Sequence, residues 1–518
     1  MNSRLDDLLQ KHFHFTHFRP GQREIIEAVL KGNDVLGVLP TGSGKSLCYL
    51  LPSLILPYPT VVVSPLISLM IDQVKETKAF HMKEVVALHS LLSFDEREKI
   101  LSRLQDYKVV YLSPELLQNE RILARLQSVQ VSLFVVDEAH CISQWGYDFR
   151  PDYLRLKQAI RALNNPTVLA LSGTVTPDIA EDIILELDRE GMQLFHYDTE
   201  RKNIALHIER LTVPGEKDER LYEILSTYSV PTIIYFSSRR QAELVAQSLQ
   251  KKLPDRRVSY YHAELEPNSR LKIQQQFIYD QLDIICATSA FGMGINKPNV
   301  RLVIHYHLPS QLEAFIQEIG RAGRDGKESL SVLLYEPGDD ILPLRLIDQE
   351  LPTEKQVRTF LNFLYVLHKK GRKLQASADD LAQQLQIDET IVRLLLYQVE
   401  RYRLVDQSYI VYDSSHWKVS LEQILNDIES RRGKKREKFR EMLQYVHTDR
   451  CLRVELYRHF QSKVDSLEEN CCSNCGLSSV NLTEESVNLT EERNQELVLP
   501  VADWKNELAR VLGIGELR

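Results

Sequence analysis

The chain has 518 residues, which predicts roughly three or four domains of ordinary size. Hydrophobic residues make up 43% of the chain. Its net charge is −8, which excludes binding to nucleic acid through overall positive charge and leaves only local basic patches. The N-terminus has no apolar signal region, and the longest apolar stretch, residues 49–58, is interrupted by Pro52 and Pro57. We therefore expect a cytoplasmic protein with no membrane span and no membrane partner.

A phosphate-binding loop is predicted near the N-terminus. An apolar strand at residues 35–39 runs into the sequence PTGSGKS at residues 40–46, and a helix follows. Glycines let backbone N–H groups approach phosphates, and the helix N-terminus adds a favourable dipole. Lys45 would contact the β- and γ-phosphates and Ser46 would bind Mg²⁺. The remaining cofactor-binding positions of the loop are Thr41, Gly42, Ser43 and Gly44.

An acidic pair follows a second apolar strand, residues 133–136. Open α/β sheets place their chemistry at the carboxyl ends of their strands, where Asp137 and Glu138 would lie. Asp137 is predicted to hold Mg²⁺, directly or through water. Glu138 is predicted to orient and deprotonate an attacking water.

An aromatic loop comes next. Trp145, Tyr147 and Phe149 are followed by Arg150 and Tyr153. Such side chains suit stacking on the bases of single-stranded nucleic acid, although an aromatic-rich loop can also be a plug of the core. Because the loop follows the acidic pair directly, we predict that it joins nucleotide hydrolysis to nucleic-acid contact.

Apolar strands alternate with helical patterns in two successive blocks, which predicts parallel, doubly wound sheets. The first block includes strands at residues 61–66 and 168–171, and the pattern restarts near residue 200. The second block ends in the sequence QEIGRAGRDG. Its Arg321 and Arg324, flanked by glycines, can enter a phosphate site from a facing domain, as arginine fingers do in nucleotide hydrolases.

The motifs FRPGQ, TGSGKS, DEAH, QWGYDFRPDY, ATSAFGMGINKPNVR and QEIGRAGRDG occur in this order. Together they resemble a RecQ-family DNA helicase of superfamily two, in particular the short bacterial RecS-type members. The resemblance is dense over residues 10–345. It implies an α/β fold with two RecA-like lobes, at residues 1–200 and 201–345, and with ATP and Mg²⁺ in the cleft between them.

The resemblance also implies roles for single residues. Gln22, with Arg19 nearby, would recognise adenine. The γ-phosphate would be contacted from the second lobe by Gln317, Arg321 and Arg324. The loop from Trp145 to Arg150 would sense single-stranded DNA. Family members move 3′ to 5′ along one strand. The resemblance also implies that single-stranded and forked DNA are partners, with single-strand-binding and other repair proteins. A nucleoid-associated monomer is expected.

Three positions depart from the family pattern. Tyr147 stands where histidine is usual in the aromatic loop, which puts the strength of coupling in doubt. Residues 172–174 read Ser-Gly-Thr instead of Thr-Ala-Thr, and Glu264 replaces a glycine. None of these changes removes a residue that handles ATP.

Residues 346–440 resemble a winged-helix insert, with helices at residues 357–369, 377–385 and 389–401 followed by two short strands. The helix at residues 389–401 would be the DNA reader in the usual geometry. A structural spacer or a docking module for a partner is the alternative. Residues 431–440 contain seven basic residues and are a candidate phosphate-binding patch, or else a solvated helix face.

Seven cysteines are present, and Cys48, Cys141 and Cys286 are expected to be buried thiols. The other four resemble the zinc-binding region of the family, expected here as a small helical subdomain at residues 441–478: Cys451, Cys471, Cys472 and Cys475. Adjacent cysteines ligate one ion only with strain. Either all four bind Zn²⁺ in an unusual geometry, or one is spare and another group completes the site, or the thiols are free. Residues 479–518 are expected to be an acidic linker with a short tail helix.

The interpretation that follows is an ATP-dependent DNA helicase, a DNA-stimulated ATPase moving 3′ to 5′ in repair, recombination or replication. One alternative is an RNA helicase of the DEAH type, against which the aromatic loop argues. The other is a winged-helix DNA-binding module with a decayed motor, against which Lys45, Glu138 and Arg321 argue because they are intact.

Overall fold

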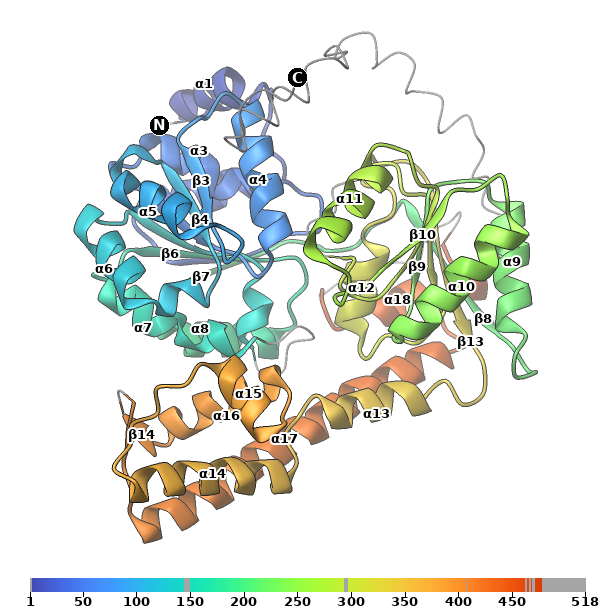
Figure 1. Cartoon of the computed structure of the whole chain (residues 1–518). Coiled ribbons are helices and arrows are strands. Elements are labelled where there is room, and N and C mark those ends of the chain that lie inside the picture. The colour runs from blue at the N-terminus through green and yellow to red at the C-terminus, as the bar shows by residue number, and fades with distance from the viewer. Residues whose placement is uncertain are drawn as a thin grey trace, which may run out of the picture.

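The short apolar runs of the sequence become the strands of two parallel sheets, each enclosed by helices (Figure 1). The computed structural model of the chain describes residues 2–143, 150–292, 297–406, 408–461, 464, 467 and 471–477. The central strands of both sheets are buried along all or nearly all of their length, because helices cover both faces, whereas the edge strand at Gln193–His196 is largely exposed. This burial explains why the runs lack the alternation of a half-exposed strand.

The first sheet has seven strands, all parallel, and forms lobe 1. In sheet order they are β3 (Val85–Leu88), β4 (Val109–Leu112), β2 (Thr60–Val63), β5 (Leu133–Val136), β6 (Thr167–Ser172), β1 (Val35–Val38) and β7 (Gln193–His196). The helices of this lobe are α1 (Asn2–Phe13), α2 (Gln22–Leu30), α3 (Leu47–Ile55), α4 (Ile67–Ala79), α5 (Phe94–Ser102), α6 (Glu120–Val129), α7 (Leu156–Ala162) and α8 (Pro177–Leu187). Short 3₁₀ turns are η1 (Leu104–Asp106), η2 (Leu116–Gln118), η3 (Ala139–Ile142) and η4 (Pro151–Arg155).

The second sheet has six parallel strands and forms lobe 2. In sheet order they are β10 (Val258–Tyr261), β11 (Ile284–Ala287), β9 (Thr232–Tyr235), β12 (Leu302–His305), β13 (Ser329–Tyr335) and β8 (Ile204–Arg210). Its helices are α9 (Lys217–Thr227), α10 (Arg239–Lys252), α11 (Pro267–Ile278) and α12 (Leu312–Ile319). The two-lobe, doubly wound architecture expected from the sequence is confirmed.

Below the lobes, helices form an insert with a hydrophobic core of its own (Figure 1). Its elements, with those that follow it, are α13 (Ile341–Gln349), α14 (Glu354–Lys369), α15 (Ala378–Leu385), α16 (Glu389–Arg401), β14 (Val405–Asp406), β15 (Tyr409–Ile410), α17 (Ser414–Val446), α18 (Leu452–Tyr457) and η5 (Ser473–Cys475). Three helices followed by the antiparallel hairpin β14–β15 have the order of a winged helix. Capping boxes at Thr353 and Ser377 set the starts of α14 and α15.

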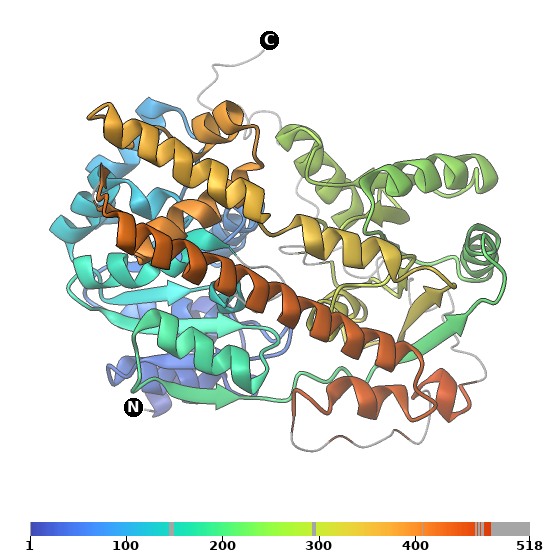
Figure 2. The same cartoon turned by 90° about the horizontal axis from the view of Figure 1, so that it is seen from below.

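The long helix α17 belongs to two cores. Its first half contributes Trp417 and Ile424 to the core of the insert, and its second half contributes Phe439 and Met442 to a core of lobe 2. Figure 2 shows this helix running from the insert toward lobe 2. Its 33 residues correspond to about 50 Å. The helix therefore ties the insert to the second lobe.

The helix α16 is not free to read DNA, so that expectation is wrong. Most of its residues are buried, and its charged side chains pair with lobe 1. Arg393 Nη1 lies 3.3 Å from Asp152 Oδ2, and Arg155 Nη2 lies 2.9 Å from Glu400 Oε2. Through these contacts α16 docks the insert onto lobe 1.

The basic run at residues 431–440 is also not an open phosphate-binding patch. Arg431 is buried, and four of the other charges are paired with carboxylates. Lys435 pairs with Glu350 at 2.5 Å and Arg436 with Asp348 at 2.8 Å. These pairs hold α17 against neighbouring helices.

Cys48, Cys141 and Cys286 are buried, as expected. In the part of the chain that the structure describes, no helix combines the length and the apolar character that a membrane crossing requires. The predicted tail helix and acidic linker at residues 479–518 lie outside the described residues.

Candidate active site and metal centre

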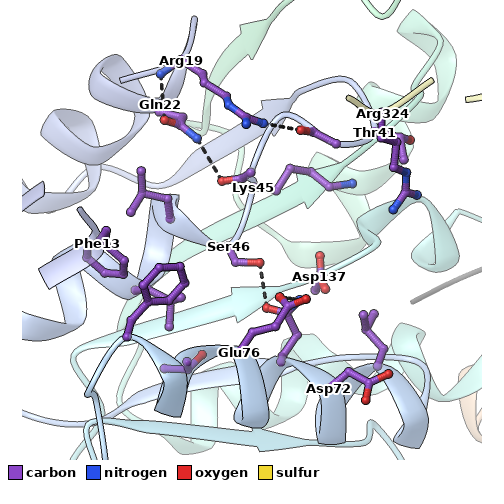
Figure 3. Close-up of a pocket in the computed structure, with 18 of the residues that line it drawn as sticks. Phe13, Arg19, Gln22, Thr41, Lys45, Ser46, Asp72, Glu76, Asp137 and Arg324 are labelled. Atoms are coloured by element: carbon purple, nitrogen blue, oxygen red, sulfur yellow. Dashed lines mark hydrogen bonds between the residues drawn. The ribbon is translucent and has the colours of Figure 1, made fainter. Parts of the chain in front are cut away.

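A cavity of about 400 Å³ lies where the two lobes face each other (Figure 3). Lobe 1 lines it with the loop after β1, with α4 and with the acidic pair after β5. Lobe 2 lines it with Gln317, Arg321 and Arg324. Residues more than 270 positions apart in the sequence therefore share one site, as the motifs predict.

The backbone of the loop after β1 is held from outside by two side chains of the FRPGQ segment. Gln22 Nε2 donates hydrogen bonds to the carbonyl oxygens of Ser43 and Gly44, at 2.9 and 3.1 Å, and the Arg19 guanidinium donates to that of Gly42 (Figure 3). Gly44 has φ +78°, and a Cβ there would lie 2.9 Å from Gln22 Nε2. The loop thus needs glycine at this position for both conformation and space.

The acidic pair lies at the carboxyl end of β5. Glu138 has φ 48°, a left-handed turn that directs its carboxylate into the cavity, where Oε1 is 3.6 Å from Lys45 Nζ. His140 Nδ1 lies 3.4 Å from Glu138 Oε2 and 2.9 Å from Ser172 Oγ. The DEAH segment is therefore connected to the Ser-Gly-Thr segment that begins with the last residue of β6.

Burial and the neighbouring Glu138 carboxylate raise the pKa of Asp137 to about 7. Burial opposes ionisation of Glu138 as well, but Lys45, His140 and Arg321 together lower its pKa. The two carboxyl groups therefore differ in proton affinity: Glu138 carries the negative charge, and Asp137 requires a cation beside it to be fully ionised at neutral pH.

Ser46 Oγ donates a hydrogen bond to Gln73 Oε1 at 2.8 Å, and Asp72 and Glu76 lie on the same helix α4 as Gln73 (Figure 3). The hydroxyl of Ser46 and the carboxylate of Asp137 line one cavity. Oxygen ligands of this kind suit Mg²⁺, so the donor set fits the metal that the motifs imply.

The two arginines of lobe 2 enter the site from the facing side. Burial, followed by the proximity of Arg321 and Arg201, lowers the pKa of Arg324 to about 9. A Cβ placed on Gly42 would lie 3.7 Å from Arg324 Cγ, so this side chain lies against the phosphate-binding loop. The cluster of cations is electrostatically costly without an anion, which indicates a site shaped for phosphate.

Arg201 and Asn203, in the linker between the lobes, are functional candidates that sequence reasoning missed. Arg201 donates hydrogen bonds to the carbonyl oxygens of Thr41 at 3.3 Å, Gly320 at 3.5 Å and Ala322 at 3.3 Å, and also to that of Gly323. It therefore joins the phosphate-binding loop of lobe 1 to the arginine loop of lobe 2. No local pattern marks it, because its partners are backbone atoms of distant segments.

Asn203 fixes the conformation of the same arginine loop. Its Nδ2 donates to the carbonyl oxygens of Gly323 and Lys327, both at 2.8 Å. Gly323 has φ +57°, and a Cβ there would lie 2.3 Å from Asn203 Nδ2. Glycine at this position is required for the close contact, which explains a glycine between the two arginines.

Trp145, Tyr147 and Phe149 lie outside the described residues. The segment that follows them is anchored to residues 137–141: Arg150 N donates to Cys141 O at 3.0 Å, and the buried Tyr153 hydroxyl donates to Asp137 O at 3.2 Å. Tyr153 thus joins the segment that begins at Arg150 to the backbone of Asp137.

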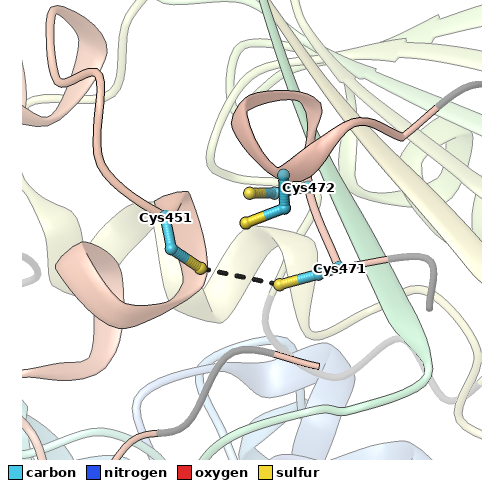
Figure 4. A group of neighbouring side chains, drawn as sticks. Cys451, Cys471 and Cys472 are labelled. Atoms are coloured by element: carbon cyan, nitrogen blue, oxygen red, sulfur yellow. Dashed lines mark hydrogen bonds between the residues drawn. The ribbon is translucent and has the colours of Figure 1, made fainter. Parts of the chain in front are cut away.

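All four late cysteines come together (Figure 4). The sulfur atoms of Cys451, Cys471, Cys472 and Cys475 lie within 4.8 Å of one another. Tetrahedral zinc with Zn–S bonds of about 2.3 Å places its sulfurs about 3.8 Å apart. The Sγ atoms of Cys451 and Cys471 are 3.6 Å apart, so the donor set fits zinc.

The adjacency of Cys471 and Cys472 does not prevent this arrangement. Leu452 N donates to Cys472 Sγ at 3.3 Å, and Cys472 pairs with Leu206 of β8 in an isolated bridge. Burial alone would raise the pKa of the Cys472 thiol, but hydrogen bonds from backbone N–H groups, that of Leu452 first, outweigh burial and lower it. A thiolate, the form that binds zinc, is thereby favoured.

The cysteine region also contacts the linker between the lobes. Arg453 of α18 is fully buried, and its guanidinium donates to Glu200 Oε1 at 3.2 Å, to Arg201 O at 3.2 Å and to Ile204 O at 2.5 Å. The same linker carries Arg201 and Asn203. The cysteine cluster is therefore connected, through one short helix, to the residues that hold the arginine loop.

Three family models match the chain: DEAD/DEAH box helicase at residues 19–183, helicase conserved C-terminal domain at residues 216–326, and RecQ zinc-binding at residues 406–476. The probable ATP-dependent DNA helicase RecS of Bacillus subtilis (strain 168) is 39% identical over 521 aligned positions, which cover 99% of this chain and 100% of that protein. ATP-dependent DNA helicase RecQ of the same organism is 36% identical over 69% of this chain and 60% of its own length.

Solved structures with the same fold include Mycobacterium smegmatis helicase Lhr bound to ssDNA and AMP-PNP, with a TM-score of 0.56 and 20% identity over 85% of this chain and 57% of that chain. Another is the DEAD-box helicase Mss116 bound to ssRNA, with a TM-score of 0.56 and 18% identity over 87% and 89%. These likenesses show two RecA-like lobes. Since a relative matches along the whole length and the family models cover both lobes and the cysteine region, this chain belongs to the RecQ family of ATP-dependent DNA helicases.

Proposed function

We propose that this helicase hydrolyses ATP in the cavity between its lobes and uses the reaction to move 3′ to 5′ along one DNA strand. The observation that carries the proposal is the meeting of Lys45 and Glu138 of lobe 1 with Arg321 and Arg324 of lobe 2 around one cavity. Both lobes can therefore contact ATP when they close on it. Opening one base-pair step costs about 1.4 kcal/mol of stacking, so repeated turnover has to drive unwinding.

The residues that line the cavity have different roles in ATP hydrolysis. Glu138, kept ionised by Lys45, is the group that accepts the proton of the attacking water. Lys45, Gln317, Arg321 and Arg324 surround the charge that develops on the γ-phosphate. Ser46 and Asp137 would hold Mg²⁺, which neutralises phosphate charge when bound. Thr41, Gly42, Ser43 and Gly44 supply the backbone cradle.

Adenine recognition is proposed for the end of the cavity lined by Arg19 and Gln22. Phe15, which the sequence reasoning did not select, lines the same cavity and is 46% exposed. An aromatic ring and a guanidinium that line one pocket suit stacking on both faces of a purine. Because Gln22 also holds the phosphate-binding loop, it would link base recognition to the position of that loop.

We propose single-stranded and forked DNA as the substrate, sensed by Trp145, Tyr147, Phe149 and Arg150. The anchoring of Arg150 and Tyr153 next to Asp137 supports coupling between this loop and hydrolysis. A complete ATP cavity within one chain supports a monomer as the working unit. We propose that the protein acts on chromosomal DNA in the cytoplasm, in repair, recombination or replication. Its proposed partners are single-strand-binding and other repair proteins.

Single-stranded DNA is expected to stimulate ATP hydrolysis strongly, and RNA of the same length much less. The variant Trp145→Ala is expected to lose most of the stimulation by DNA while keeping the basal rate, because the ATP cavity is intact without this ring. Steady-state ATP hydrolysis against DNA concentration measures both effects. Equal stimulation by RNA would favour an RNA helicase, and full stimulation of the variant would make the aromatic loop structural.

We propose that all four cysteines hold one Zn²⁺ that stabilises the small helical subdomain at residues 441–478, and that residues 1–200, 201–345 and 346–440 are the other folded domains. The helix α17 crosses the boundary proposed at residue 440. The insert and the zinc region therefore share this helix. Loss of zinc would also disturb the linker that Arg453 contacts.

One zinc ion per chain is expected by metal analysis of the purified protein. Cys472→Ser is expected to reduce this content by about tenfold or more and to lower the melting temperature, because a structural zinc site contributes folding energy. Cys48→Ala is the control, since this buried thiol lies in lobe 1. Unchanged zinc content in Cys472→Ser would show that Cys472 is the spare cysteine.

A further inference from the structure

One face of the helix α4 carries polar side chains into the cavity between the lobes, and the mechanism described above does not use them. The lining residues of this helix recur every three or four positions, so they share one face. They are Leu69, Asp72, Gln73, Glu76, Thr77 and Phe80.

The topology of lobe 1 brings this face to the edge of the sheet that carries the acidic pair. The helix α4 follows β2, and β2 lies beside β5 in the sheet. The two parallel strands end together, where Asp137 N donates a hydrogen bond to Val63 O at 2.9 Å. The side chains of α4 therefore lie at the same edge as Ser46 and Asp137, and all of them line one cavity.

Gln73 accepts the proton of the Ser46 hydroxyl. Ser46 Oγ donates to Gln73 Oε1 at 2.8 Å, the dashed line at Ser46 in Figure 3. A hydroxyl has one proton to donate and two lone pairs, so this hydrogen bond leaves the lone pairs of the oxygen available as ligands. A serine that pointed its proton into the cavity would present a partial positive charge to a cation. Gln73 therefore selects the hydroxyl orientation that a metal ligand needs.

Glu76 in turn fixes the amide of Gln73. Gln73 Nε2 donates to Glu76 Oε2 at 3.4 Å, one helical turn further along α4. The reversed amide would place its carbonyl oxygen against this carboxylate, and two acceptors repel each other. Glu76 thus keeps the oxygen of Gln73 directed at Ser46.

Tyr49 is a second polar group near Ser46, three residues later in the chain. Its hydroxyl hydrogen-bonds with that of Tyr111 at 3.2 Å, and the side chain is buried outside the cavity lining. Gln73 lines the cavity and already receives the Ser46 proton, so it is the stronger candidate for orienting this hydroxyl.

We propose that Gln73 is a positioning residue for Mg²⁺, which accepts the Ser46 proton and so presents the Ser46 oxygen as a metal ligand. Groups that hold a metal ligand in place typically contribute about 10- to 100-fold in metal affinity. The inference rests on the proposed function, in which Ser46 and Asp137 hold Mg²⁺ beside ATP. It adds that a residue of α4, acting through Ser46, sets how much Mg²⁺ the site requires.

The test measures binding of a fluorescent, non-hydrolysable ATP analogue as Mg²⁺ is titrated, so the result does not depend on hydrolysis. Gln73→Met keeps the length of the side chain and removes its oxygen. The Mg²⁺ concentration at half of the metal-dependent gain in affinity should rise by about 10- to 100-fold. Affinity without Mg²⁺, in EDTA, and at saturating Mg²⁺ should stay as in the wild type. Gln73→Glu keeps an oxygen acceptor and should stay close to the wild-type Mg²⁺ requirement.

Gln127→Met is the matched control. Gln127 lies on another helix of lobe 1, α6, where its amide donates to Ala162 O at 2.8 Å outside the cavity lining. This control should retain the wild-type Mg²⁺ requirement. The double variant Ser46→Ala with Gln73→Met should need no more Mg²⁺ than Ser46→Ala alone, because Gln73 acts through Ser46. An unchanged requirement in Gln73→Met, an equal rise in the control, or additive effects in the double variant would overturn the proposal.

Two further variants separate this inference from the proposed function. A raised requirement in Tyr49→Phe with none in Gln73→Met would assign the orienting role to Tyr49 and overturn the inference alone. A raised requirement in Ser46→Ala with none in Gln73→Met would also overturn the inference alone. An unchanged requirement in Ser46→Ala would refute the metal role proposed for Ser46, and the inference about Gln73 with it.

Discussion

Lys45→Ala is expected to reduce ATP hydrolysis by about 10³-fold or more, with binding of single-stranded DNA retained. Lys45 Nζ lies 3.6 Å from Glu138 Oε1 and lines the cavity that lobe 2 closes. Its removal takes away a cation from the γ-phosphate and also the charge that keeps Glu138 ionised. Hydrolysis therefore loses both transition-state stabilisation and its proton acceptor.

The same variant should lose strand separation. The wild type is expected to unwind a duplex with a 3′ single-stranded tail, and not one with a 5′ tail, in a reaction that needs ATP; Lys45→Ala should unwind neither. Lys75→Ala, an exposed lysine on α4 outside the cavity lining, is the control and should behave as the wild type. Retained hydrolysis in Lys45→Ala would refute the phosphate assignment, and unwinding of the 5′-tailed duplex would refute the direction of movement.

Arg201→Gln is expected to lower the kcat of DNA-stimulated ATP hydrolysis by roughly 10²-fold, with the KM for ATP changed only a few-fold. Arg201 does not face the reacting atoms; it holds the backbone from Gly320 to Gly323 against Thr41. A displacement of catalytic groups by about 1 Å can cost 10²-fold in rate. Because we propose that Arg324 and Arg321 stabilise the transition state, their misplacement should appear in kcat rather than in KM.

Arg210→Gln is the matched control for this variant. Arg210 also donates two hydrogen bonds to backbone carbonyl oxygens, those of Val446 and Thr448, both at 2.7 Å, but at the far end of β8 from the arginine loop. The variant Arg210→Gln should lower the stability of the folded protein without the selective loss in kcat. Arg201→Lys should not restore the rate, since one ammonium group cannot reach carbonyl oxygens on both lobes. Equal kcat values in the Arg201 and Arg210 variants would refute the positioning role.

That the proposed ATP-binding residues line one cavity was predictable because the parts of the site are local. A strand, a glycine-rich turn and a helix place Lys45 and Ser46 whatever surrounds them, and a strand end places Asp137 and Glu138. The two arginines were predictable from their flanking glycines. Gln22, however, has a contact that no sequence pattern indicates: its side-chain amide holds the backbone of the phosphate-binding loop.

The sequence by itself thus determined the two parallel sheets, the order of the ATP motifs and the presence of a cysteine-rich end, since each depends on hydrophobic runs or on residues adjacent in the chain. Only the tertiary structure decided which charges are available. It docked α16 onto lobe 1 and paired four of the seven basic residues at 431–440 with carboxylates. It also brought four cysteines together and placed Arg201 between the lobes. The physical reason is that ion pairs, metal sites and backbone clamps depend on partners far apart in sequence, and folding alone brings these partners into contact.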